Sequence, residues 1–113
     1  MFDSVTFNAL SSALDGLAAR QRAIANNVAN VNTPGYHAQR VSFEDALAES
    51  VKQGSGVTAP TTKKSLDPTR IDGNNVNLDT ETLSNIDTVL RFQFASNATS
   101  TQFSYVRAAI GGN

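Results

Sequence analysis

Apolar side chains recur at alternating intervals of three and four residues along the first third of this 113-residue chain. The series consists of Phe7, Leu10, Leu14, Leu17, Gln21, Ile24, Val28 and Val31, of which only Gln21 is polar. This spacing is typical of a coiled-coil seam, where a narrow stripe of one long helix meets a second helix. It predicts a helix from Ser4 to Val31, with Asp3 or Ser4 as its N-cap. The alternative is an ordinary amphipathic core helix, which normally has a wider apolar stripe.

A second long helix is expected from Asp79 to about Ile110, ending at Gly111-Gly112. Its apolar residues fall on two nearly opposite sides. One side carries Leu83, Ile86, Leu90, Phe94 and Tyr105, and the other carries Phe92, Phe103, Val106 and Ile110. The first helix could cover one side, but the chain has little left to cover the other, so a second molecule is needed. A break between residues 95 and 101, giving two shorter helices, is the alternative.

The first helix is expected to end in a tight turn. The residues that signal this end are Asn26, Asn27, Asn30, Asn32, Thr33, Pro34, Gly35 and Tyr36. Asparagine lowers helix propensity, and proline pushes the preceding residue out of the helical region. Pro34-Gly35 fits the central positions of a type II turn, with positive φ at the glycine.

The middle of the chain is expected to have little regular structure. Residues 36–41 are predicted to be extended. A short helix should run from Ser42 to Lys52, with Ser42 as its cap and Asp45 in the capping-box position. Residues 53–72 have few apolar side chains, which predicts a mobile loop with a solvated Lys63-Lys64 pair.

The composition argues against most catalytic and binding functions. Cysteine is absent and His37 is the single histidine, which excludes thiol chemistry, cysteine-ligated zinc and a histidine-centred triad. Nine basic and ten acidic residues give a net charge of −1, which favours neither nucleic acid nor an anionic membrane. No apolar run is long enough to span a membrane, and the first 30 residues lack the pattern of a cleavable secretory signal. We therefore expect a single all-α domain without enzymatic activity, cofactor or metal.

Small polar residues are unusually frequent. Asparagine, serine and threonine occur eleven times each and weaken helix interiors, because their side chains compete for backbone hydrogen bonds. The C-terminal helix is therefore predicted to be marginal in the isolated chain unless a partner buries it.

The segment from Ala25 to Tyr36, with its repeated asparagines followed by Thr-Pro-Gly-Tyr, resembles the N-terminal signature of flagellar rod, hook and hook-associated axial proteins. Two further stretches, residues 39–44 and 72–81, together with the short length, resemble the proximal-rod members of that family. Asn77 departs from the pattern, because an acidic residue is expected there. The polar stretch at residues 96–101 also departs from it.

The resemblance implies a fold and partners. The terminal helices, within residues 1–32 and 79–113, would pair as an antiparallel coiled coil, joined by the turn, short helix and loop of residues 33–78. Such subunits assemble with copies of themselves and with other rod proteins into a hollow shaft needed for motility. Contacts with the membrane-ring junction protein and the export gate are also implied. Export would occur through the flagellar type III apparatus, without a cleaved signal. Phe43 and Leu47 are similar to a motif read by the export gate, although packing on a helix explains the same spacing.

Two other functions stay open at this point. Another rod or hook component is disfavoured by the short length and by the Gly73–Val76 stretch. A soluble helical adaptor or secretion chaperone would instead be a stable helical monomer or dimer.

Overall fold

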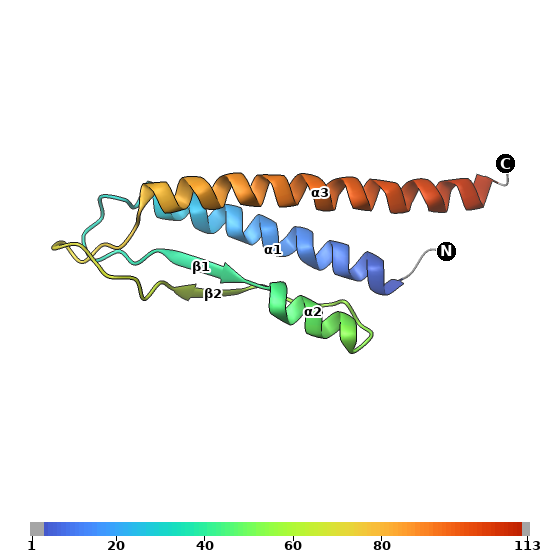
Figure 1. Cartoon of the computed structure of the whole chain (residues 1–113), viewed down its shortest axis with the longest axis horizontal. Coiled ribbons are helices and arrows are strands. Elements are labelled where there is room, and N and C mark those ends of the chain that lie inside the picture. The colour runs from blue at the N-terminus through green and yellow to red at the C-terminus, as the bar shows by residue number, and fades with distance from the viewer. Residues whose placement is uncertain (1–3, 112–113) are drawn as a thin grey trace.

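The computed structural model describes residues 4–111, which form two long helices beside a small sheet and a short helix (Figure 1). In chain order the elements are α1 (Ser4–Ala29), β1 (Gln39–Ser42), α2 (Glu44–Lys52), β2 (Thr61–Lys64) and α3 (Leu78–Gly111). The molecule measures 64 × 26 × 15 Å, and its radius of gyration is 17.6 Å. A compact chain of this length has a radius of gyration of about 13 Å. The chain therefore forms a flat slab that is little thicker than one helix.

The elements form three layers within the slab. Figure 1 shows α1 in the middle, with α3 on one side and the two strands and α2 on the other. The helices α1 and α3 run in opposite directions, and α3 continues beyond the first turn of α1. The predicted pair of long terminal helices is confirmed. A coiled coil between them is not confirmed, and the all-α prediction needs correction because the chain also contains a two-stranded sheet.

The first helix ends in the predicted turn. The Tyr36 backbone N–H donates to the carbonyl of Thr33 at 3.2 Å, and Gly35 has φ of 74°. These are the features of a type II turn with glycine at its third position. The helix starts at Ser4 among the described residues, and the proposed cap Asp3 lies outside them.

The segment predicted to be a mobile loop contains the second strand. β2 pairs antiparallel with β1, with Gln39 opposite Lys64 and Ser42 opposite Thr61. All four residues of β2 are exposed, so backbone hydrogen bonds form this strand and burial contributes little. The loop before it is tied to α1 because the Ser12 hydroxyl donates to the Gly56 carbonyl at 2.9 Å. The prediction was wrong because it considered only apolar content.

The short helix α2 begins later than predicted and without the predicted cap. Its first residue is Glu44, and Phe43 occupies the N-cap position with no side-chain hydrogen bond. Ser42 lies instead at the end of β1. The Phe43 ring is buried against Gly16 of α1, so packing places the helix start. The other buried residues of this small apolar core are Leu17, Ala23, Val41 and Ala95.

The long helix α3 is continuous. Asn77 caps it, because its Oδ1 accepts the backbone N–H groups of Asp79 and Thr80 at 2.9 and 3.3 Å. Asparagine is therefore well suited to the position where an acid was expected. The alternative of a break near residues 95–101 is wrong. In that stretch the Thr99 and Thr101 hydroxyls donate to carbonyls four residues earlier, which satisfies them within the helix.

Candidate assembly surface

The large apolar side chains of α3 lie exposed along its length. Phe94 is 78% exposed and Leu83 is 69% exposed. The other exposed members of the two predicted sides are Ile86, Leu90, Phe92, Phe103, Tyr105 and Ile110, and Val106 alone is partly buried. So many exposed large apolar side chains on one helix are typical of an interaction site.

A different stripe of α3 faces α1. Its buried residues are Glu81, Thr88 and Ala95, spaced seven residues apart, and we call them the contact stripe. These side chains are polar or small, so along this stripe α3 lies against α1 without inserting large apolar groups. The expectation that one apolar side would bury itself against the first helix is therefore not met.

The predicted seam of α1 is only partly covered. Leu17 and Ile24 are buried, whereas Val28 is exposed. The remaining seam residues Phe7, Leu10, Leu14, Gln21 and Val31 are partly exposed. At the far end, the Phe7 and Phe103 rings meet edge to face with centroids 5.1 Å apart.

An apolar groove runs on the side of α3 nearest α2. We call it the α2-side groove; its volume is about 450 Å³. Its apolar lining comes from three helices and the residue before α2: Leu10, Ala13, Leu17, Phe43, Leu47, Leu90, Phe94 and Ala95. Phe43 is only 4% exposed, and Leu47 is partly exposed. Both residues of the suggested export motif therefore contribute to this groove.

A second surface lies on the other side of the contact stripe. Its hollow of about 390 Å³ is lined by Ala18, Gln21, Val89, Phe92 and Gln93, which we call the opposite side. Nearer the end of the molecule, Phe7, Leu14 and Phe103 line a further hollow of about 320 Å³. No residue of either lining is charged.

Ion pairs border the α2-side groove. Both terminal nitrogens of Arg20 donate to the Glu44 carboxylate, at 2.6 and 2.8 Å, and Arg91 of α3 reaches the same carboxylate at 3.4 Å. Hydrogen bonding from Arg20 is the main cause that lowers the pKa of Glu44 to about 2. The same hydrogen bond raises the pKa of Arg20. Arg91 also pairs with Asp87 at 2.9 Å. These pairs fix α1, α2 and α3 relative to one another around the groove.

A buried polar cluster holds α3 against α1 at the other end of the molecule. Asn27 is fully buried, and its amide nitrogen donates to the Gln39 carbonyl at 3.0 Å and to Glu81 Oε1 at 2.5 Å. Its oxygen accepts the Gln39 backbone N–H at 2.7 Å and the Tyr36 hydroxyl at 3.3 Å. The Glu81 side chain is 1% exposed, and its carboxylate also accepts a hydrogen bond from the Arg40 guanidinium at 3.0 Å. Burial is the main cause that raises the pKa of Tyr36, with a contribution from the Glu81 charge.

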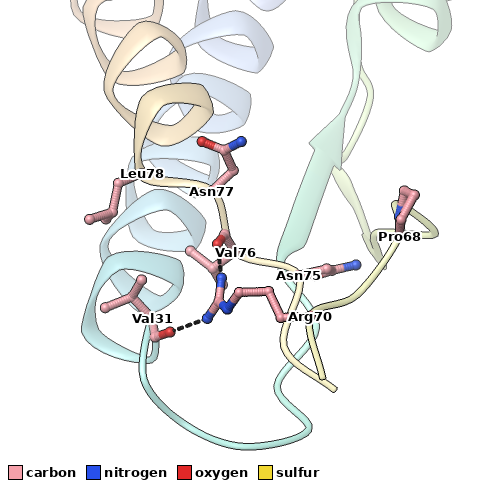
Figure 2. A pocket seen from close by; sticks show the side chains of 7 residues that line it. All are labelled: Val31, Pro68, Arg70, Asn75, Val76, Asn77 and Leu78. Atoms are coloured by element: carbon pink, nitrogen blue, oxygen red, sulfur yellow. Dashed lines mark hydrogen bonds between the residues drawn. The ribbon is translucent and has the colours of Figure 1, made fainter. Parts of the chain in front are cut away.

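A second set of polar contacts joins the turn to the segment before α3. The Asn74 amide donates to the carbonyls of Asn30 and Thr33 at 2.8 and 2.9 Å. Figure 2 shows Arg70 between two chain segments, donating to the carbonyls of Val31 at 2.6 Å and Val76 at 2.7 Å. The turn motif is thus a structural connection that orients both long helices.

The eight residues of the turn motif differ in their burial. Only Asn27 is buried; Asn30 and Tyr36 are partly buried, and Asn26, Asn32, Thr33, Pro34 and Gly35 are exposed. Within residues 4–111, every buried side-chain nitrogen or oxygen has a hydrogen-bond partner.

Sequence reasoning missed the roles of Glu81, Arg70 and Asn74. The seven-residue spacing of Glu81, Thr88 and Ala95 was the available signal, but it does not stand out because none of these residues is large and apolar.

Neither a metal-binding cluster nor a membrane-spanning helix occurs among the described residues. In the described part of the chain, no three histidine, aspartate or glutamate side chains gather where they could hold a metal ion. None of the described helices combines the length and apolar character needed to cross a membrane.

The chain is similar to known flagellar proteins. A family model described as "Flagella basal body rod protein" matches residues 7–37. The "Flagellar basal body rod protein FlgB" of Escherichia coli (strain K12) is 30% identical over 112 residues, covering 80% of this chain and 81% of that protein. The protein of the same name from Bacillus subtilis (strain 168) is 43% identical over 44 residues, covering 39% of this chain and 34% of the relative. The "Flagellar basal-body rod protein FlgG" of Caulobacter vibrioides is 42% identical over 48 residues, covering 40% of this chain and 18% of that protein.

Proposed function

Because this chain belongs to the flagella basal body rod protein family and is a structural subunit of the basal body rod, we propose that it assembles through the exposed sides of α3 as a proximal-rod subunit. The single observation that carries this proposal is the exposure of large apolar residues along both sides of one helix. In the rod, copies of the chain and other rod proteins cover these sides. The terminal helices then complete a coiled-coil-like packing that the isolated chain lacks.

The flat shape supports this role. A slab 15 Å thick cannot bury both sides of a 34-residue helix within itself. Coupling assembly to helix burial also accounts for the abundance of serine, threonine and asparagine in α3, since the partner supplies the stabilisation that intrinsic propensity does not. The subunit on this proposal transmits torque by packing and performs no chemistry.

The test is a charge placed on the exposed surface. Phe94→Glu should abolish rod assembly and swimming in cells that lack their own copy of the gene, because it buries an unpaired carboxylate in the interface. Thr62→Glu, at an exposed position of β2 and outside the proposed surface, is the control and should leave swimming intact. Normal swimming with Phe94→Glu, at normal protein level, would refute the proposal.

We propose further that the subunit contacts the membrane-ring junction protein and the export gate, and that the chain leaves the cell through the flagellar type III apparatus. Phe43 is buried in the folded chain, so the gate would have to read Phe43 and Leu47 before folding. The double variant Phe43→Ala/Leu47→Ala should then reduce export. Gly16→Ala disturbs the packing of Phe43 but keeps the motif, so export should be retained. Equal loss with both variants would show that the residues matter only for the fold.

A further inference from the structure

We propose that the opposite side of one copy, centred on Val89 and Phe92, docks into the α2-side groove of a second copy. The interface would then join two different surfaces of the same chain. This inference rests on the assembly proposed above, and adds which surfaces meet.

The positions of the two surfaces support it. Leu90 and Phe94 lie on one side of the contact stripe, and Val89 and Phe92 lie on the other. Each copy therefore presents a groove on one side and its candidate occupant on the other. Contacts between unlike surfaces repeat from copy to copy and build rings or helical arrays, whereas a contact between like surfaces stops at a dimer.

The charges of the two surfaces are compatible. The groove is bordered by Glu44 and Arg91, and both are already paired within the chain, Glu44 with Arg20 and Arg91 with Asp87. An occupant therefore needs no charge of its own, and a charged one would be buried without a partner. The lining of the opposite side contains no charged residue. Docking would cover apolar surface without leaving any ion unpaired.

Pairing of two α2-side grooves fits less well. Two grooves facing one another would bring the same ion-pair networks together. Such a dimer would also leave Val89 and Phe92 uncovered on its outer surfaces.

Cross-linking between copies tests this arrangement, and the chain contains no cysteine of its own. Leu47→Cys places a thiol in the groove, and Gln93→Cys places one on the opposite side. The two variants, one of them tagged, are produced together in cells lacking the native gene, and isolated basal bodies are oxidised. We expect a disulfide-linked pair that contains both variants, and none when either variant is produced alone. Asn97→Cys replaces Gln93→Cys as the matched control and should give no product with Leu47→Cys.

Two results would overturn the inference. One is a self-linked product of Leu47→Cys alone, which indicates pairing of like surfaces. The other is the absence of the mixed product in motile cells, which indicates that the two surfaces do not meet although the rod assembles. If either variant prevents motility, Ala13→Cys with Ala18→Cys probes the same two surfaces with smaller changes. Motility with Phe94→Glu refutes assembly through α3 itself, so failure of the proposed function is distinguishable from a wrong choice of surfaces.

Discussion

Replacing Asn27 by alanine should destabilise the fold far more than the same change at the neighbouring Asn26. Asn27 is fully buried and takes part in four hydrogen bonds, to Gln39, Tyr36 and Glu81. Asn26 is exposed, and its side chain has one long contact, 3.5 Å to Gln39. The two positions share the residue type and the last turn of α1. Their comparison therefore isolates the buried contacts from helix propensity.

The magnitude follows from the groups left behind. A hydrogen bond makes a net contribution of about 1 kcal/mol to the free energy of unfolding, and a hydrogen bond to a charged group contributes about 1.5–3 kcal/mol. Alanine at either position gains roughly 0.5 kcal/mol in helix propensity. Allowing for partial rearrangement around Glu81, we expect Asn27→Ala to lower the free energy of unfolding by roughly 2–4 kcal/mol. Asn26→Ala should change it by less than about 0.5 kcal/mol.

The assay is urea unfolding followed by far-ultraviolet circular dichroism at one low protein concentration. With an m-value of about 1–3 kcal/mol/M, the midpoint of Asn27→Ala should fall by on the order of 1–2 M relative to Asn26→Ala. Asn27→Asp keeps the shape but removes both donors and brings a second carboxyl group next to Glu81. It should unfold at least as easily as the alanine variant. Coincident midpoints for Asn26→Ala and Asn27→Ala would refute the view that this cluster holds the helices together.

Further predictions concern pH and two packing contacts. The pKa of Glu44 is lowered from 4.5 to about 2 in the folded chain, so the ionised carboxylate should stabilise the fold fully above pH 4.5 and lose this effect as the pH falls toward 2. In thermal melts, Glu44→Gln should lose this part of the dependence of stability on acid pH. An unchanged pH dependence in the variant would contradict the prediction. Gly16→Ala places a Cβ against the Phe43 ring and should lower the free energy of unfolding by about 1–3 kcal/mol, whereas Gly111→Ala meets open space and should be neutral or stabilising. Equal effects of the two substitutions would contradict the packing. Arg70→Ala should speed amide hydrogen exchange around Val31 and Val76. Arg70→Lys should fail to restore protection, because one ammonium group cannot replace the planar guanidinium between two carbonyls. Full protection in the lysine variant would contradict this role of the guanidinium.

The local structure was largely predictable from the sequence. The periodicity of α1, the Thr33-Pro34-Gly35 stop and the long final helix each depend on signals within a few residues. They agree with the structure to within about two residues at the helix ends. The strand β2 was not predictable from its own residues, because its partner β1 lies about 20 residues away and supplies the hydrogen bonds.

The orientation of α3 was not predictable for a different reason. A hydrophobic pattern identifies which sides of a helix need cover, but it does not state whether the cover belongs to the same chain. In α3 most of the large apolar side chains stay exposed, and Glu81 turns inward because Asn27 and Arg40 satisfy its carboxylate. The usual assumption that the largest apolar residues face the chain's own core therefore fails for α3.

The separation of Asn27 and Glu81 along the chain has a consequence for the timing of folding. The two residues are 54 positions apart, and the contact of Asn74 with Thr33 spans 41 positions. A chain that becomes available from its N-terminus onward therefore cannot form these contacts until most of its length is free. Closing such long loops costs conformational entropy before the contacts can stabilise the fold. The contacts that join α3 to α1 through Asn27 can therefore form only after Glu81, in the first turn of α3, is available.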